Sequence, residues 1–187
     1  MKIKKPQVYN ILLLVFIVLM ILPQTRKPIQ IGVHSILGLF SPSIKNIEDR
    51  TQISTYNWQL LDVNSHQFDF NETKGKVVFV NLWATWCPPC IAEMPNMQKI
   101  YQDYGDKVTF LFVSNEKSTK VSAFLNKKNL TIPAYYPITN NPKEISSTSI
   151  PATYIIDKNG FIVVEKIGVA NWNSDAVREL LDQLLSE

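Results

Sequence analysis

Cysteine and histidine are both scarce in this 187-residue chain, which contains two of each. A scaffold held together by disulfides needs more cysteines, spread more widely, than this single close pair. A structural zinc site needs four ligands, and His34 and His66 fall in a linker and an outer turn rather than near the cysteines. We therefore expect Cys87 and Cys90 to form a reactive site that uses no metal and no cofactor.

An excess of charge is also lacking. The formal net charge is +3, and part of it comes from a lysine cluster at the N-terminus. A basic face for nucleic acid is therefore not expected. Hydrophobic residues make up 45% of the chain, which is enough for the core of one domain, and the length leaves room for an extension.

The start of the chain has a long uncharged stretch. Twenty consecutive residues after position 5 carry no charge, and they include an uninterrupted apolar run from Ile11 to Leu22. As a helix, about 20 residues rise about 30 Å, the thickness of the hydrocarbon core of a bilayer. The first alanine is Ala84, so the small residues of a signal-peptide cleavage site are missing. We predict that residues 1–27 form one uncleaved transmembrane helix, with a cleaved signal peptide as the alternative.

The basic residues that flank this stretch predict its orientation. Lys2, Lys4 and Lys5 precede it, whereas only Arg26 and Lys27 follow it. The more positive end tends to stay in the cytoplasm. We therefore expect a single-pass protein of the cytoplasmic (inner) membrane, with its C-terminal bulk on the extracytoplasmic or periplasmic side.

Residues 28–54 are predicted to be a juxtamembrane linker. Apolar side chains recur at helical spacing from Ile29 to Ile44, which would also suit an amphipathic helix lying on the membrane surface. We favour a linker that packs loosely against the following domain.

Residues 55–187 alternate between strand and helix patterns. We predict a hairpin (58–61 and 67–70), a buried strand (76–83), a helix (88–104), a strand (108–114), a helix (117–129), a strand (134–138), a second hairpin (150–156 and 161–167) and a last helix (174–185). This order predicts an α/β domain with a mixed central sheet flanked by helices.

The two cysteines lie where a buried strand meets a helix. Attack on a disulfide requires a thiolate, and Cys87 at the N-cap would be stabilised by the positive end of the helix. Pro88 suits the first helical position, and Pro89 also lacks an N–H, so the first free amide is that of Cys90. We predict that Cys87 is the exposed nucleophile and that Cys90 resolves the mixed disulfide.

Two motifs carry a family resemblance. Residues 81–90 (NLWATWCPPC), followed by Ala92-Glu93-Met94-Pro95, and residues 150–153 (IPAT) resemble the thioredoxin-like TlpA/ResA family of membrane-tethered extracytoplasmic reductases. The resemblance implies a thioredoxin-like fold with an N-terminal β-hairpin and an inserted helix–strand unit, here residues 117–138. It also implies a cis bond before Pro151, facing the cysteines.

The resemblance implies further site residues. Substrate is expected to meet Trp86, Pro88, Ile150 and Pro151; for Trp86 the alternative is a core residue. Glu93 resembles a glutamate common in this group and would support proton transfer; the alternative is an ordinary first-turn acid favoured by the helix dipole. Asn81 stands where thioredoxins proper carry a buried aspartate, so that proton-transfer role must pass to water or to another group.

Together these features predict a thiol–disulfide oxidoreductase that reduces disulfides of exported proteins. Cytochrome c precursors are the client type that the resemblance implies, and a membrane protein would supply electrons. The alternatives are the same fold acting as a disulfide oxidase or isomerase, and a non-catalytic peptide-binding module.

Overall fold

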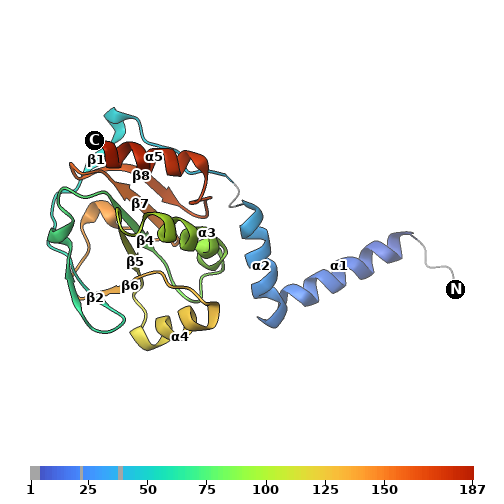
Figure 1. Cartoon of the computed structure of the whole chain (residues 1–187). Coiled ribbons are helices and arrows are strands. Elements are labelled where there is room, and N and C mark those ends of the chain that lie inside the picture. Colours follow the sequence, from blue (N-terminus) through green and yellow to red (C-terminus); the bar gives the residue numbers. More distant parts are fainter. Residues whose placement is uncertain (1–4, 22, 38–39) are drawn as a thin grey trace.

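The computed structural model describes residues 5–21, 23–37 and 40–187, and most of them belong to one α/β domain (Figure 1). The strands are β1 (Thr51–Gln52), β2 (Gln59–Asp62), β3 (Gln67–Asp69), β4 (Val78–Leu82), β5 (Thr109–Val113), β6 (Ala134–Pro137), β7 (Ala152–Ile156) and β8 (Phe161–Ile167). The α-helices are α1 (Lys5–Ile21), α2 (Pro23–Leu37), α3 (Pro88–Tyr104), α4 (Ser118–Lys128) and α5 (Asp175–Ser186). Short 3-10 turns occur at Ile47–Asp49, Phe70–Thr73 and Lys143–Ile145.

Within the described residues, the eight strands form one mixed sheet in the order β1-β8-β7-β4-β5-β6-β2-β3. The central strand β4 pairs parallel with β5 and antiparallel with β7. Its side chains alternate between two buried clusters, because successive residues of a strand point to opposite faces. Phe79 packs in the cluster that includes residues of α3 and α5, and Val80 packs in the cluster on the other face. The predicted mixed sheet with flanking helices is confirmed.

The N-terminal hairpin and the inserted unit meet at one side of the sheet. Strands β2 and β3 pair antiparallel, as predicted. The inserted strand β6 pairs parallel with β5 and antiparallel with β2, so the insert joins the hairpin to the central strands. Helix α4 begins after Lys117 and ends at Asn129, whose left-handed φ of 54° terminates it.

Residues 40–54 lie along the opposite side of the sheet, in a range predicted to be a linker. Strand β1 pairs antiparallel with β8, and the backbone N–H of Ile53 donates to the carbonyl of Gly160 at 2.9 Å. The Ile53 side chain is buried, so this segment adds apolar contacts as well as backbone hydrogen bonds to the domain. A two-residue strand is too short to leave a periodic pattern in the sequence.

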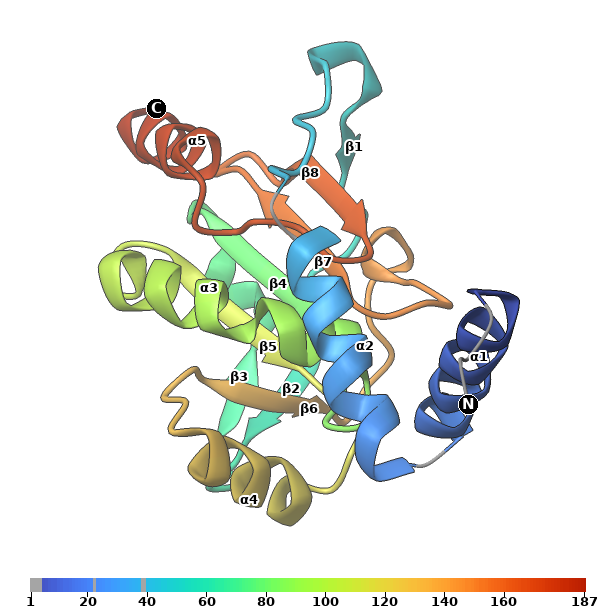
Figure 2. The same cartoon turned by 90° about the vertical axis from the view of Figure 1, so that its right-hand side faces the viewer.

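The two N-terminal helices lie outside the sheet. Helix α2 packs against α3 (Figure 2), and α1 extends away from the domain (Figure 1). Along α1 large apolar side chains are exposed from Val8 to Leu19. Among the residues that the structure describes, no helix is both long and apolar enough to cross a membrane. Lys2, Lys4 and Leu22, which entered the anchor prediction, lie outside the described residues.

Candidate active site

The cysteine pair sits at the start of α3, as predicted. Cys87 is the N-cap residue, with extended backbone dihedrals, and Pro88 opens the helix. The amide N–H of Cys90 donates to the Cys87 sulfur, with 3.2 Å between nitrogen and sulfur. It is the first N–H of the helix, because the two residues before it are prolines. The two cysteines are joined as a disulfide.

In this disulfide form Cys87 is 3% exposed, which corrects the expectation of an exposed side chain. The loop before β7 lies against the sulfur, and the Ile150 carbonyl oxygen is 3.8 Å from Cys87 Sγ. The Ile150–Pro151 peptide bond is cis, as the resemblance implied. Trp86 is 58% exposed beside the pair, so a client would meet this indole and the Ile150 loop before it reaches the sulfur.

The buried residues of α3 include a carboxyl group as well as Cys90. Glu93 is 1% exposed, one turn after Cys90 on α3. Its Oε2 accepts a hydrogen bond from Trp172 Nε1 at 2.9 Å, and its Oε1 accepts one from Asn81 Nδ2 at 3.2 Å. Burial raises the pKa of Glu93, whereas hydrogen bonds from Trp172, the Ala170 backbone and Asn81 lower it. Burial is the larger effect, and the pKa is about 8.

The alternative reading of Glu93 as an ordinary first-turn acid is wrong. A first-turn acid gains from the helix dipole while it stays solvated, whereas this side chain points into the core. The buried face of α3 includes Cys90, Glu93, Met94 and Met97. That spacing of three and four residues is a signal in the sequence that could have placed Glu93 inside.

Asn81 joins the carboxyl group to the neighbouring strand. Its side-chain amide donates to Glu93 and also to Thr153 Oγ1, at 2.8 Å. Asn81 and Thr153 are direct partners in the β4–β7 ladder, which explains how the two motifs of the sequence meet. Asn81 Oδ1 is buried without a hydrogen-bond partner among the described residues. Sequence reasoning missed Thr153 and Trp172 as members of this group.

The loop between β4 and Cys87 is fixed by a second acidic side chain. The Thr85 amide donates to Glu116 Oε2 at 2.6 Å, and the Thr85 hydroxyl donates to Oε1 at 3.0 Å. Lys120 forms an ion pair with the same carboxylate. Burial opposes ionisation of Glu116, but hydrogen bonds from Lys120 and Thr85 outweigh it and lower the pKa. The sequence gives no local signal of this contact, because Thr85 and Glu116 are 31 residues apart.

The fold and the cysteine pair define a thioredoxin-like thiol–disulfide oxidoreductase. The Redoxin family matches residues 42–184, so the chain belongs to the redoxin family. It is 35% identical over 130 residues to the thioredoxin-like protein YneN of Bacillus subtilis, covering 67% of this chain and 75% of YneN. It is also 32% identical over 136 residues to the thiol-disulfide oxidoreductase ResA of Halalkalibacterium halodurans, covering 70% of this chain and 75% of that protein.

A solved structure supports the fold independently. The DsbF homologue from Corynebacterium diphtheriae superposes with a TM-score of 0.60, covering 80% of this chain and 100% of that one. The sequence identity is 18%, so this likeness concerns the fold. The predicted thioredoxin-like fold and oxidoreductase class are confirmed.

Proposed function

We propose that this oxidoreductase acts mainly as a reductant of disulfides in exported proteins. The observation that carries the proposal is the start of α3, where two successive prolines remove two amide donors and the Cys90 N–H remains for the Cys87 sulfur. The Cys87 thiolate is therefore only modestly stabilised. Strong oxidants of disulfide chemistry owe their power to a stable reduced form, so a weaker thiolate favours giving electrons away.

The proposed reaction uses the two cysteines in sequence. The Cys87 thiolate attacks the client disulfide, forming a mixed disulfide and releasing one client thiol. Cys90 then loses its proton and attacks the Cys87 sulfur, which releases the second client thiol and leaves the Cys87–Cys90 disulfide. The client gains the two electrons that the enzyme's dithiol loses.

Proton transfer is assigned to Glu93. Asn81 cannot titrate, whereas a carboxyl group with a pKa of about 8 exchanges protons in the range where thiols titrate, near ~8.5. Glu93 would take up the proton that Cys90 releases. Asn81 and Trp172 hold the carboxyl group in place through their hydrogen bonds.

The site beside the cysteines is proposed to bind the client. Trp86 offers an exposed apolar ring, and the Ile150–Pro151 loop offers backbone next to the Cys87 sulfur. An extended client segment can pair with such backbone by strand addition. Pro88 lies beside Cys87 at the start of α3 and would contact the same segment.

The direction is tested by the reduction potential of the Cys87–Cys90 pair, measured by equilibration with redox buffers. We expect a value at or below that of glutaredoxins, about −200 to −230 mV, and a mostly dithiol pair in cells. A value near about −120 mV, with a fully oxidised cellular pool, would make the protein an oxidase. An insulin-reduction assay distinguishes catalysis from simple peptide binding.

We further propose that residues 1–27 anchor the protein in the cytoplasmic membrane, with residues 28–54 connecting the anchor to a catalytic domain of residues 55–187 on the extracytoplasmic or periplasmic side. The uncharged apolar stretch, the excess of lysines before it and the exposed apolar side chains of α1 support this location. A membrane protein would then return electrons to the pair, and tethering would raise the local concentration near it. Cytochrome c precursors are the proposed clients.

Fractionation tests the anchor: recovery of the protein in the soluble fraction, shortened at its N-terminus, would contradict it.

A further inference from the structure

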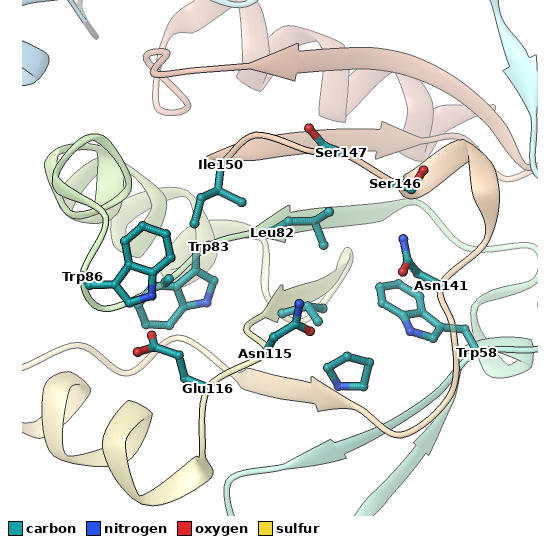
Figure 3. A pocket seen from close by; sticks show the side chains of 13 residues that line it. Trp58, Leu82, Trp83, Trp86, Asn115, Glu116, Asn141, Ser146, Ser147 and Ile150 are labelled. Atoms are coloured by element: carbon teal, nitrogen blue, oxygen red, sulfur yellow. The ribbon is translucent and has the colours of Figure 1, made fainter.

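A pocket of about 350 Å³ opens beside the active-site surface. Trp86 and Ile150, which flank the Cys87 sulfur, form one end, and Trp58 forms the other (Figure 3). Leu82, Val113 and Pro137 contribute apolar walls. Its volume falls at the lower end of the range for ligand sites, about 300–1,000 Å³, so it suits a single side chain better than a cofactor.

The pocket walls include two indole N–H groups. Trp58 Nε1 and Trp83 Nε1 are both buried and unpaired among the described residues. In Figure 3 the nitrogen-bearing edge of Trp83 faces the pocket, and the ring of Trp58 enters from the opposite end. A buried donor without an acceptor is costly, so such groups are usually satisfied by a partner. What the two indole N–H groups lack is therefore a hydrogen-bond acceptor.

The acceptor is further defined by the other polar groups. Glu116 lines the pocket near Trp86, and its two oxygens are held by Thr85 and Lys120. No lysine or arginine is among the described residues that line the pocket, so an anion would find no free cation there. Asn141 donates from Nδ2 to the Ile145 carbonyl, so this amide is already used within the protein. A neutral carbonyl oxygen on an apolar stem fits these constraints, whereas a carboxylate does not.

We propose that this pocket is a specificity subsite for a carboxamide side chain, glutamine or asparagine, that flanks the attacked cysteine of the client. The inference rests on the proposed client-reducing function and deepens it. The occupant is the client because the pocket shares Trp86 and Ile150 with the cysteine site, and the Ile150 carbonyl lies 3.8 Å from Cys87 Sγ. The side chain would enter between the two indoles and accept a hydrogen bond from Trp83 once the pocket walls adjust around it.

The test uses blocked disulfide peptides that differ only at one position near the attacked cysteine. Glutamine, leucine, glutamate and lysine are compared at each of the two positions on either side. We expect kcat/KM for the glutamine peptide to exceed those for leucine and glutamate about tenfold at one position, as one hydrogen bond to an otherwise unpaired donor predicts. Equal rates for all four side chains at every position would overturn the subsite, and this comparison requires no variant.

Two variants assign the preference to the indoles. Trp83→Phe keeps an aromatic ring without the N–H, and it should reduce the glutamine preference to within about twofold while a small, featureless disulfide is reduced as before. Trp58→Phe removes the other unpaired indole N–H, at the far end of the pocket, and should keep most of the preference because the hydrogen bond comes from Trp83; thermal unfolding shows that each variant is folded. An undiminished preference in Trp83→Phe would overturn the inference. Failure of the wild type to reduce even the small disulfide would overturn the proposed function as well.

Discussion

The two sides of the Cys87–Cys90 pair differ in how deeply their side chains are buried. On the interior side Glu93 is held by Asn81 and Trp172, at 1% exposure. On the outer side Trp86 is 58% exposed, and its indole makes no hydrogen bond with the residues that the structure describes. Burial penalises the charged form of Glu93 and so changes its proton affinity. Exposure leaves the Trp86 ring free to be covered by a client. We therefore propose that chemistry and recognition are divided between the two sides of one disulfide.

The division has a structural origin in the sheet. The interior side is built by β4, β7 and α3, whose pairing brings Asn81, Thr153 and Glu93 together. The outer side is built by the loops that follow β4 and precede β7. Loops at the ends of a rigid sheet can vary without disturbing its core. Substitutions on the interior side should therefore alter pH dependence, and those on the outer side should alter client affinity.

The largest effect is expected at the pair itself. Cys90→Ser should accumulate clients as mixed disulfides through Cys87, because the resolving attack is lost, and turnover should fall to the uncatalysed rate. Cys87→Ser should lose turnover equally but trap almost no client. Non-reducing gel analysis of each variant, incubated with an oxidised client, measures the adducts. Equal trapping by both variants would contradict the assigned order of attack.

The next largest effect is expected at Glu93, on the interior side, and it is seen in how stability and turnover depend on pH. Burial raises the pKa of Glu93 from 4.5 to about 8, so between those values the folded protein retains a proton that the unfolded chain has released. The free energy of unfolding therefore falls as pH rises through this window, by up to about 1.4 kcal/mol per pH unit from this group. Glu93→Gln should remove that slope and slow turnover about 100-fold, as loss of a proton-transfer group predicts.

This prediction is measured by denaturant unfolding of the disulfide form at several pH values, so that no thiol titrates. The wild type should lose stability relative to Glu93→Gln between pH 5 and pH 8. Parallel pH curves for the two proteins would show that burial does not raise the pKa of Glu93, and would remove the match to the thiol pKa on which its role in proton transfer rests.

A smaller change on the same side concerns the group that holds Glu93. Trp172→Phe removes the N–H that contacts Oε2, a bond that favours the ionised carboxylate. The pKa of Glu93 should then rise further, by about one unit, which is the size of one hydrogen bond to a charged group. The pH curve of stability relative to Glu93→Gln reports this shift. Trp58→Phe is the matched control: its indole N–H is unpaired and its ring packs in the other core cluster, so the curve should not move.

Much of the fold was predictable because its signals are local. The apolar run of β4 predicts a buried central strand, and the Asp157–Gly160 turn predicts the hairpin of β7 and β8, where Gly160 adopts a φ of 82°. Cys87 at the N-cap followed by prolines predicts the start of α3. In each case the decisive information lies within a few residues.

The parts that were not predicted depend on contacts between distant segments. The bond from Trp172 to Glu93 joins residues 79 positions apart, and a tryptophan in a loop carries no local sign of its partner. Helix α2 contains Pro28, which weakens a helical interpretation of the sequence, although α2 packs against α3. Anchoring of Thr85 by Glu116 likewise follows from tertiary structure.

The smallest effect is expected on the outer side. Trp86→Ala removes an exposed ring beside the cysteines, and loss of this apolar contact should raise KM for a protein client about three- to tenfold, with kcat nearly unchanged. The pH dependence of stability should stay that of the wild type, because Trp86 has no bond to Glu93 among the described residues. Ile47→Ala, which truncates an even more exposed apolar side chain in a different segment of the chain, is the control and should leave KM unchanged. Steady-state kinetics with a protein client and with a small disulfide measure both. If Trp86→Ala lowered kcat for the small disulfide as well, the ring would act on the cysteines themselves, and the two sides of the pair would not be separate in function.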